Sequence, residues 1–266
     1  ELVEFNFFQE QDPIVLILIN KFKKQGTKIN LYQDGLKPYV AHSMKFSPAL
    51  VLNNIKQNLW IKRNGYPVSD YWSFINCKTY GFIKGIDNLY LTFPKAYLNW
   101  NKLPIETITP QFTDDFVHLL KRVFKWNDSL LKDRKKVIFF LNQPMHDDGS
   151  FDVYILRHLQ KKYPHSTIYI KNHPLTSKLK LNKYKEINNV KIIDSKIPAE
   201  VFINELKESI VFSVVSTAMF IKNSSCEFYY TYKIKKNNNI ERLKKYEVVN
   251  PTEHVISCKT VDEIVF

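Results

Sequence analysis

Apolar runs that alternate with amphipathic segments organise the second half of the chain. Residues 137–141 form a continuous apolar run, which is typical of a strand buried on both faces. Residues 151–163 then place apolar side chains at helical spacing, and Pro164 ends the segment. Further strands are predicted over residues 166–170, 190–193 and 209–215, and a further helix over residues 199–206. Strands and helices that alternate at this spacing predict βαβ units around a parallel sheet.

The first half of the chain is less regular. Its predicted elements are a helix over residues 13–24 and strands over residues 27–32 and 88–93. The rest of residues 40–110 is rich in aromatic residues and weakly periodic. No core strand is visible ahead of the first helix, so we expect this half to lack an N-terminal segment.

A helix over residues 113–126 connects the two halves. Thr113 caps it, acidic residues occupy its first turn and basic residues its last. We therefore predict one domain over residues 1–130 and a second over residues 131–266. The basic, Asn-rich stretch 233–245 is expected to be a solvated loop.

Three polar loops follow strands of the second half. They supply Asn142, Gln143 and Pro144, then Lys171, His173 and Pro174, and finally Ser213, Ser216 and Thr217. Ligands of parallel sheets bind outside the carboxyl ends of the strands, and these amides and hydroxyls suit a nucleotide. No glycine-rich phosphate loop is present, which disfavours NAD and ATP sites of the usual kind. No Asp-x-Asp pair is present to link a metal ion to a diphosphate.

Two residues at strand ends are candidates for proton transfer. Pro174 restricts His173 to an extended conformation, which aims the imidazole outward. A lone histidine is more often structural than catalytic. Asp34 ends a strand of the first half, where Gly35 allows a sharp turn, although Asp-Gly is also an ordinary turn pair. Together these two residues could supply an acid and a base.

The charge balance limits the classes of partner that the protein is expected to bind. Of 266 residues, 39 are Lys or Arg and 26 are Asp or Glu, which gives a formal net charge of +13. Such an excess indicates nucleic acid, an acidic membrane face or an acidic polysaccharide, or it reflects a Lys-rich composition alone. Basic clusters that could line a groove for a polyanion, or simply be solvated, are Lys62 and Arg63, then Lys121, Arg122 and Lys125, and then Lys132, Arg134, Lys135 and Lys136. Three scattered cysteines and the absence of a long apolar run favour neither a disulfide framework nor a membrane span.

The motifs in their order resemble those of bacterial capsular polysialyltransferases and the related lipooligosaccharide sialyltransferases. Those families carry an acidic pair before a glycine, then a His-Pro motif, then a Ser/Thr motif. The matching segments are residues 32–35, 171–174 and 213–217. This chain departs from the pattern because Gln33 stands where the first acid is expected. The segment 146–149 carries two aspartates before a glycine, but it lies in the second half, so it ranks below Asp34.

The resemblance implies an α/β fold of GT-B type, with two Rossmann-like domains that face each other across a cleft. Residues 1–130 would hold the acceptor and residues 131–266 the nucleotide sugar. The enzyme would transfer sialic acid from CMP-sialic acid with inversion and without a metal cofactor. Asp34 would act as general base and His173 would assist the departing CMP phosphate. The remaining loop residues would bind the nucleotide, while Gln33, Gly35 and the basic clusters would bind the acceptor.

The implied partner is an anionic oligosialic or polysialic acid chain, lipid-linked and destined for a capsule. We accordingly expect a cytoplasmic protein, peripheral on the inner face of the bacterial inner membrane, in contact with it or with a capsule export complex. One alternative is a mono-sialyltransferase or another GT-B transferase of capsule or lipooligosaccharide synthesis. A distant alternative is a basic nucleic-acid-binding protein, but no recognition module for nucleic acid is visible.

Overall fold

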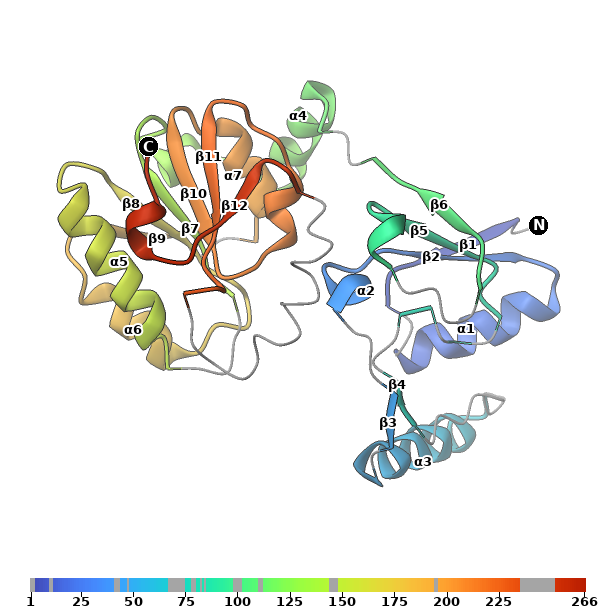
Figure 1. The fold of residues 1–266 in the computed structure, drawn as a ribbon. Helices are drawn as coiled ribbons and strands as arrows, with labels where there is room; N and C mark the ends of the chain where they lie inside the picture. Colours follow the sequence, from blue (N-terminus) through green and yellow to red (C-terminus); the bar gives the residue numbers. More distant parts are fainter. Residues whose placement is uncertain are drawn as a thin grey trace. The chain divides into compact units, whose positions relative to one another are not determined.

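The computed structural model describes two compact units. It describes residues 3–9, 12–40, 44–46, 48–66, 75–77, 80–81, 83, 85–97, 102–109, 112–143, 148–193, 196–234 and 252–266. One unit comprises Glu1–Pro110, and the other comprises Gln111–Leu243 and Thr252–Phe266. Each unit contains its own parallel sheet (Figure 1).

The second unit is built on a six-stranded parallel sheet. Its strands are β7 (Ile138–Leu141), β8 (Ile168–Lys171), β9 (Val190–Ile193), β10 (Ser209–Ser213), β11 (Cys226–Tyr230) and β12 (Val255–Ser257). The spatial order is β12-β11-β10-β7-β8-β9, with every neighbouring pair parallel. This is the doubly wound Rossmann order: β8 and β9 are added on one side of β7, and β10 to β12 on the other, so the strand order reverses between β7 and β10.

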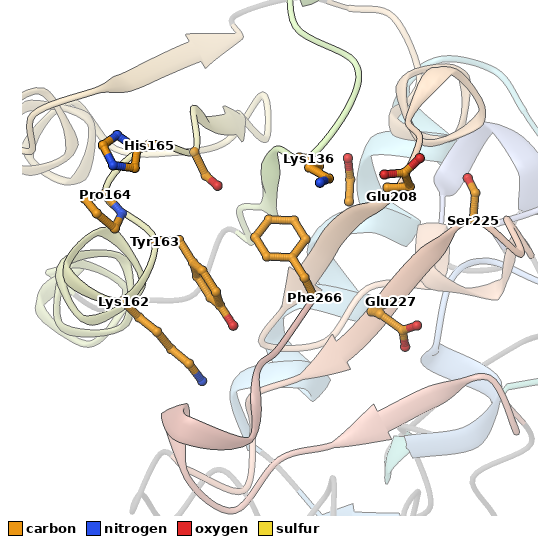
Figure 2. A pocket seen from close by; sticks show the side chains of 11 residues that line it. Lys136, Lys162, Tyr163, Pro164, His165, Glu208, Ser225, Glu227 and Phe266 are labelled. Atoms are coloured by element: carbon orange, nitrogen blue, oxygen red, sulfur yellow. The ribbon is translucent and has the colours of Figure 1, made fainter.

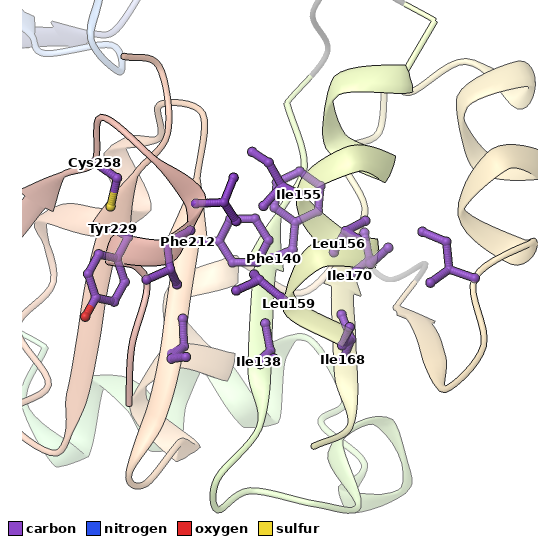
Figure 3. Close-up of a cluster of buried hydrophobic side chains, with 14 of the residues drawn as sticks. Ile138, Phe140, Ile155, Leu156, Leu159, Ile168, Ile170, Phe212, Tyr229 and Cys258 are labelled. Atoms are coloured by element: carbon purple, nitrogen blue, oxygen red, sulfur yellow. The ribbon is translucent and has the colours of Figure 1, made fainter. Parts of the chain in front are cut away.

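Helices cover both faces of this sheet. The elements are α4 (Asp114–Val123), η2 (Asp128–Leu131), α5 (Ser150–Lys162), α6 (Lys178–Lys185), α7 (Ala199–Glu205), η3 (Thr217–Phe220) and η5 (Val261–Glu263). Phe140 and Phe212 stack on one face, in a buried cluster with residues of α5 (Figure 3). Phe139 stacks on Phe202 of α7 on the other face. Burial on both faces explains why β7 is a continuous apolar run.

The first unit contains a smaller parallel sheet of order β1-β2-β5-β6. Its elements are β1 (Glu4–Phe7), α1 (Pro13–Lys24), β2 (Lys28–Tyr32), α2 (Lys37–Val40), β5 (Asn88–Leu91), η1 (Pro94–Ala96) and β6 (Ile105–Thr107). A separate antiparallel pair, β3 (Met44–Phe46) and β4 (Ile75–Cys77), packs with helix α3 (Pro48–Arg63). Within the described ranges, no helix has the length and apolarity needed to cross a bilayer.

The structure corrects part of the sequence interpretation. A core strand does precede α1, because β1 pairs with β2 in parallel register. Helix α4, capped by Thr113 as predicted, belongs to the second unit because it packs on α7 and Lys121 pairs with Glu205. The division between units therefore falls before this helix, whereas the sequence placed it after residue 130. Most of the stretch 233–245 lies outside the described residues.

Candidate functional site

Three predicted ligand loops come together at the carboxyl edge of the second sheet. They follow β10, β7 and β8, which are adjacent and parallel. Ser213 is fully buried, and its hydroxyl donates a hydrogen bond of 2.9 Å to the Leu141 carbonyl across the switch point. Ser213 therefore joins β10 to β7, in contrast to the direct nucleotide contact expected from the sequence. The loops after these strands remain as the ligand-facing part of the edge.

His173 follows β8 and has one ring nitrogen already engaged. The Leu175 amide donates a hydrogen bond of 3.2 Å to Nδ1 within the turn that contains Pro174. A neutral imidazole that accepts at Nδ1 carries its proton on Nε2, which is thus a donor for a ligand. Burial and the charge of Lys171 lower the pKa of His173. The resting group is therefore a neutral hydrogen-bond donor at the sheet edge.

Asn142, directly after β7, holds this edge together. Its amide nitrogen donates to Asn172 Oδ1 at 3.2 Å and to Thr176 Oγ1 at 2.7 Å. Its carbonyl oxygen accepts from the Tyr184 hydroxyl at 3.1 Å. With its side chain buried and engaged on both sides, Asn142 fixes the turn of His173 against β7, whereas the sequence suggested a base contact. Gln143 is half-buried after it, and Pro144 lies outside the described residues.

A buried ion pair beneath the β7 loop was missed by the sequence analysis. Lys180 Nζ lies 2.7 Å from Asp152 Oδ2, and both side chains are at most 3% exposed. The Tyr184 hydroxyl lies 2.6 Å from the same carboxylate oxygen, and Lys180 also donates to the Gln143 carbonyl at 3.4 Å. Gly149 is required beside it, because an added Cβ would meet Lys180 Cγ at 2.8 Å. The pair therefore supports the β7 loop from α5 and α6.

Tyr184→Phe is expected to loosen this support. The change removes the hydroxyl shared by Asn142 and Asp152 and leaves their acceptors without that partner, a loss of about 1–3 kcal/mol. Amide hydrogen exchange of β7 and β8 in the full chain should accelerate accordingly. Tyr154→Phe is the matched control, because Tyr154 is exposed on α5. Equal exchange in the two variants would contradict a supporting role for Tyr184.

Lys171 and Glu200 form a second charged feature close to His173. Lys171 is buried at the end of β8; its ammonium donates to the Asn172 carbonyl at 3.2 Å and lies 5.8 Å from the Phe202 ring centroid. Burial raises the pKa of Glu200 in the first turn of α7, and the Lys171 charge opposes that rise. Lys171 was a predicted nucleotide ligand. Its burial suits it better to a fixed positive charge behind His173 than to direct contact.

The loop after β10 offers polar groups in η3. The Ser216 hydroxyl accepts from the Ala218 amide at 3.3 Å, and the Ser216 carbonyl accepts from the buried Tyr230 hydroxyl at 2.9 Å. The half-buried Thr217 side chain makes no hydrogen bond within the described part of the chain. The Ser216 hydroxyl accepts a bond and keeps its own proton, so Ser216 and Thr217 each offer a hydroxyl donor to a ligand.

Asp34 and Gln33 follow the carboxyl end of β2 in the first unit. The Gln33 carbonyl oxygen accepts from the Tyr39 hydroxyl and, at 2.9 Å, from the Thr92 amide. Gln33 thus links the ends of β2 and β5 to α2. The half-buried Asp34 carboxylate makes no hydrogen bond or ion pair among the described residues, and Gly35 turns the chain at φ +58°. The carboxylate oxygens of Asp34 can therefore accept a proton or a hydrogen bond from a ligand.

The alternative acidic segment is engaged elsewhere. Lys183 Nζ lies 2.5 Å from the Asp148 carboxylate, which also accepts from the Ser150 hydroxyl at 2.6 Å. These partners hold the pKa of Asp148 far below its usual range, so it is a poor base. His146 and Asp147 lie outside the described residues.

The predicted basic clusters separate into paired and unpaired cations. Lys121 pairs with Glu205, which also pairs with Arg134, so its charge is used within the second unit. Arg122 and Lys125 are exposed and form no ion pair within the described ranges. Lys62 and Arg63 are exposed in the last turn of α3. No group of three His, Cys, Asp or Glu among the described residues is placed to hold a metal ion.

A cavity of about 640 Å³ lies at the opposite, amino edge of the second sheet (Figure 2). Some of its polar side chains are already hydrogen-bonded: Lys162 donates to two carbonyls of the C-terminal segment, at 2.7 and 3.0 Å. The Ser209 hydroxyl donates to the Lys207 carbonyl, and the Ser225 hydroxyl to that of Leu206. Ligands of parallel sheets bind outside the carboxyl ends of the strands, so we take the carboxyl edge as the candidate site.

Three solved structures are similar to this chain. The 2,6-sialyltransferase of Photobacterium sp. JT-ISH-224, solved with the donor product CMP and the acceptor substrate lactose, matches 96% of this chain with a TM-score of 0.53 at 13% identity. This chain spans 62% of that structure's length. The GT-B domain of a Photobacterium damselae sialyltransferase matches 92% of this chain and 75% of its own, with a TM-score of 0.49 and 12% identity. The UDP-GlcNAc 2-epimerase of Neisseria meningitidis, bound to UDP-GlcNAc, matches 97% of this chain and 73% of its own length, with a TM-score of 0.44 and 11% identity.

The predicted fold class is confirmed: the chain is an α/β protein of GT-B type with two Rossmann-like parts, and it shares the fold of a bacterial sialyltransferase. Residues 5–227 match the family model described as alpha-2,8-polysialyltransferase (POLYST), so the chain belongs to that family. None of the curated proteins compared with the chain matches it. That the two parts face each other across a cleft stays a prediction.

Proposed function

We propose that this protein transfers sialic acid from CMP-sialic acid to the end of an oligosialic or polysialic acid acceptor, with inversion and without a metal cofactor. The observation that carries the proposal is His173, whose Nδ1 is occupied by the Leu175 amide and whose Nε2 proton is open at the sheet edge. Membership of the polysialyltransferase family and a fold shared with a sialyltransferase that binds CMP support it.

The proposed step is a single displacement. Asp34 accepts the proton of the acceptor hydroxyl, and the hydroxyl oxygen bonds to the anomeric carbon of the donor sugar. The bond from that carbon to the phosphate oxygen breaks, and its electron pair leaves with CMP. His173 Nε2–H and the Thr217 hydroxyl donate to the phosphate as its negative charge grows. Asn142 and Ser213 hold the loops that carry these donors.

CMP is expected to bind the second unit without a divalent ion. Calorimetry in EDTA should give the same affinity as in buffer with magnesium, and Thr217→Ala should weaken binding by about 1.5–3 kcal/mol, since a hydrogen bond to a charged phosphate is lost. The control is Thr260→Ala, whose hydroxyl bonds to Glu263 beyond β12. An absolute metal requirement, or tighter binding of UDP than of CMP, would assign the protein to a different donor.

If the acceptor is a polyanion, the salt dependence of KM should differ between long and short acceptors. Each cation that contacts the polymer releases counterions, so KM for a long oligosialic acid should rise more steeply with salt than KM for a short one. Arg122→Gln with Lys125→Gln should reduce that difference, because both cations are exposed and unpaired within the described ranges. Lys135→Gln, which removes a lysine paired with Glu208 at 2.8 Å, is the control. Equal slopes for both lengths would indicate a mono-sialyltransferase.

We further propose that the protein works on the inner face of the bacterial inner membrane, where a lipid-linked acceptor and a capsule export complex would be at hand. The formal charge of +13 supports this location, since the cytoplasmic leaflet carries anionic lipids. Cosedimentation of the protein with inner-membrane vesicles, lost at high salt, is the direct test.

A further inference from the structure

Helix α3 exposes apolar side chains on the face that it turns away from the protein. Asn58 and Ile61 are buried on its inner face, where it packs with β4 (Figure 1). On the outer face Leu52 is 60% exposed, and Leu59 and Trp60 are each 50% exposed. Apolar residues on both sides of one helix indicate two partners, of which the described residues supply only one.

The same outer face is cationic. Leu52, Lys56, Leu59 and Arg63 follow one another at spacings of four, three and four residues, which aligns them along one side of a helix. Lys62 adds a further charge in the last turn, and no Asp or Glu occurs between residues 48 and 66. Lysine and arginine side chains can lay their aliphatic stems on an apolar surface while their charges reach polar headgroups.

The helix ends at a defined position beside a tyrosine. Gly65 adopts φ +77°, and its amide donates to the Lys62 carbonyl while the Tyr66 amide donates to the Ile61 carbonyl. These two bonds form a Schellman-type C-cap. Tyr66 is 49% exposed there. A Trp and a Tyr are thus held at one end of a cationic apolar face, and these two residue types concentrate at bilayer interfaces.

We propose that the outer face of α3 lies flat on a bilayer rich in anionic lipids, with Leu52, Leu59 and Trp60 entering the headgroup region and Lys56 and Arg63 binding lipid phosphates. This assignment rests on the proposed membrane location and identifies the surface that would bind the membrane. The charge disfavours a symmetric dimer through this face, since the same cations of the two copies would be brought together. A soluble polyanion would use the cations but gain nothing from the half-exposed leucines.

Helix α4 provides a matched comparison. Phe116, Leu119 and Val123 are 41–62% exposed along one side of it, as apolar as the outer face of α3. Its first turn, however, carries Asp114 and Asp115, which offset Arg122 and the other cations. An anionic bilayer is therefore expected to bind α3 and not α4.

Vesicle flotation of the full chain tests the proposal. Wild-type protein should float with phosphatidylglycerol/phosphatidylethanolamine vesicles and not with phosphatidylcholine vesicles. Leu52→Ser/Leu59→Ser/Trp60→Ser should weaken partitioning at least roughly tenfold, and Lys56→Gln about fivefold, the equivalent of one lysine near an anionic surface. The control Phe116→Ser/Leu119→Ser/Val123→Ser should float like wild type.

Three outcomes would overturn the proposal. The α3 triple variant could float like wild type, the α4 control could lose flotation equally, or the α3 variant could lose binding to immobilised polysialic acid instead. Transfer to a short, soluble oligosialic acid is measured on the same proteins and should be unchanged by the α3 triple variant. Failure of the proposed reaction would appear there in the wild type, while flotation would report on the membrane face alone.

Discussion

His173→Ala is expected to lower sialyl transfer by about 10³-fold, within the range for loss of a positioned proton-transfer group. The imidazole donates more strongly to the phosphate as charge grows on it in the transition state, so the loss should fall mainly on kcat and less on KM for the donor. Half-buried at a turn, the ring forms one hydrogen bond, to the Leu175 amide, among the bonds described for it. The melting temperature should therefore stay within a few degrees of wild type.

His165→Ala is the matched control for this experiment. His165 precedes the same strand, β8, at its amino end, and its side chain is exposed. The substitution removes the same chemical group from the opposite edge of one sheet and should leave transfer unchanged. If His173→Ala kept activity within a few-fold of wild type, His173 would be a structural histidine.

The lowered pKa of His173 gives the same variant a pH signature. In the free protein the ring is neutral at pH 7, because burial and Lys171 disfavour its charged form. Bound CMP places a negative charge beside the ring, which raises this pKa and draws in a proton. CMP affinity should thus strengthen as the pH falls below the pKa of the complex and toward the lower pKa of the free ring, with proton uptake visible as a buffer-dependent enthalpy. His173→Ala should abolish that uptake.

The strands that position the site were predictable because both faces of the second sheet are buried. The run over residues 137–141 is apolar throughout, as its place between α5 and α7 demands. The first sheet was harder to read because its core contains a ladder of asparagines. Asn30 lies between Asn6 and Asn88, with hydrogen bonds of 2.8 Å to each, and is fully buried. Such polar pairs interrupt the apolar pattern, and β1 was missed for that reason.

Part of the candidate site could likewise be predicted from the sequence, and part could not. A histidine before a proline at a strand end can be found in sequence, because its neighbours along the chain restrict it. The support beneath it cannot, because Asp152 and Lys180 come from different helices and meet only in the fold. Asn142 and Ser213 were identified as functional by their positions; their side chains are buried and hydrogen-bonded within the sheet edge, which favours a role in holding the loops. Position along a strand therefore predicts where a site is, and burial decides which side chains can reach a ligand.

Asp34→Asn is expected to lower transfer by about 10³-fold, since the amide has the shape of the carboxylate and cannot accept the acceptor's proton. The loss should lie in kcat for the acceptor reaction, with CMP affinity unchanged. Gln33→Glu separates this assignment from its rival, in which position 33 carries the base. The carboxylate introduced at position 33 would accept the same hydrogen bonds from the Tyr39 hydroxyl and the Thr92 amide, which would lower its pKa and make it a weak base. Activity of Gln33→Glu should therefore stay within about threefold of wild type. A large gain in Gln33→Glu, or full activity in Asp34→Asn, would move the base away from Asp34.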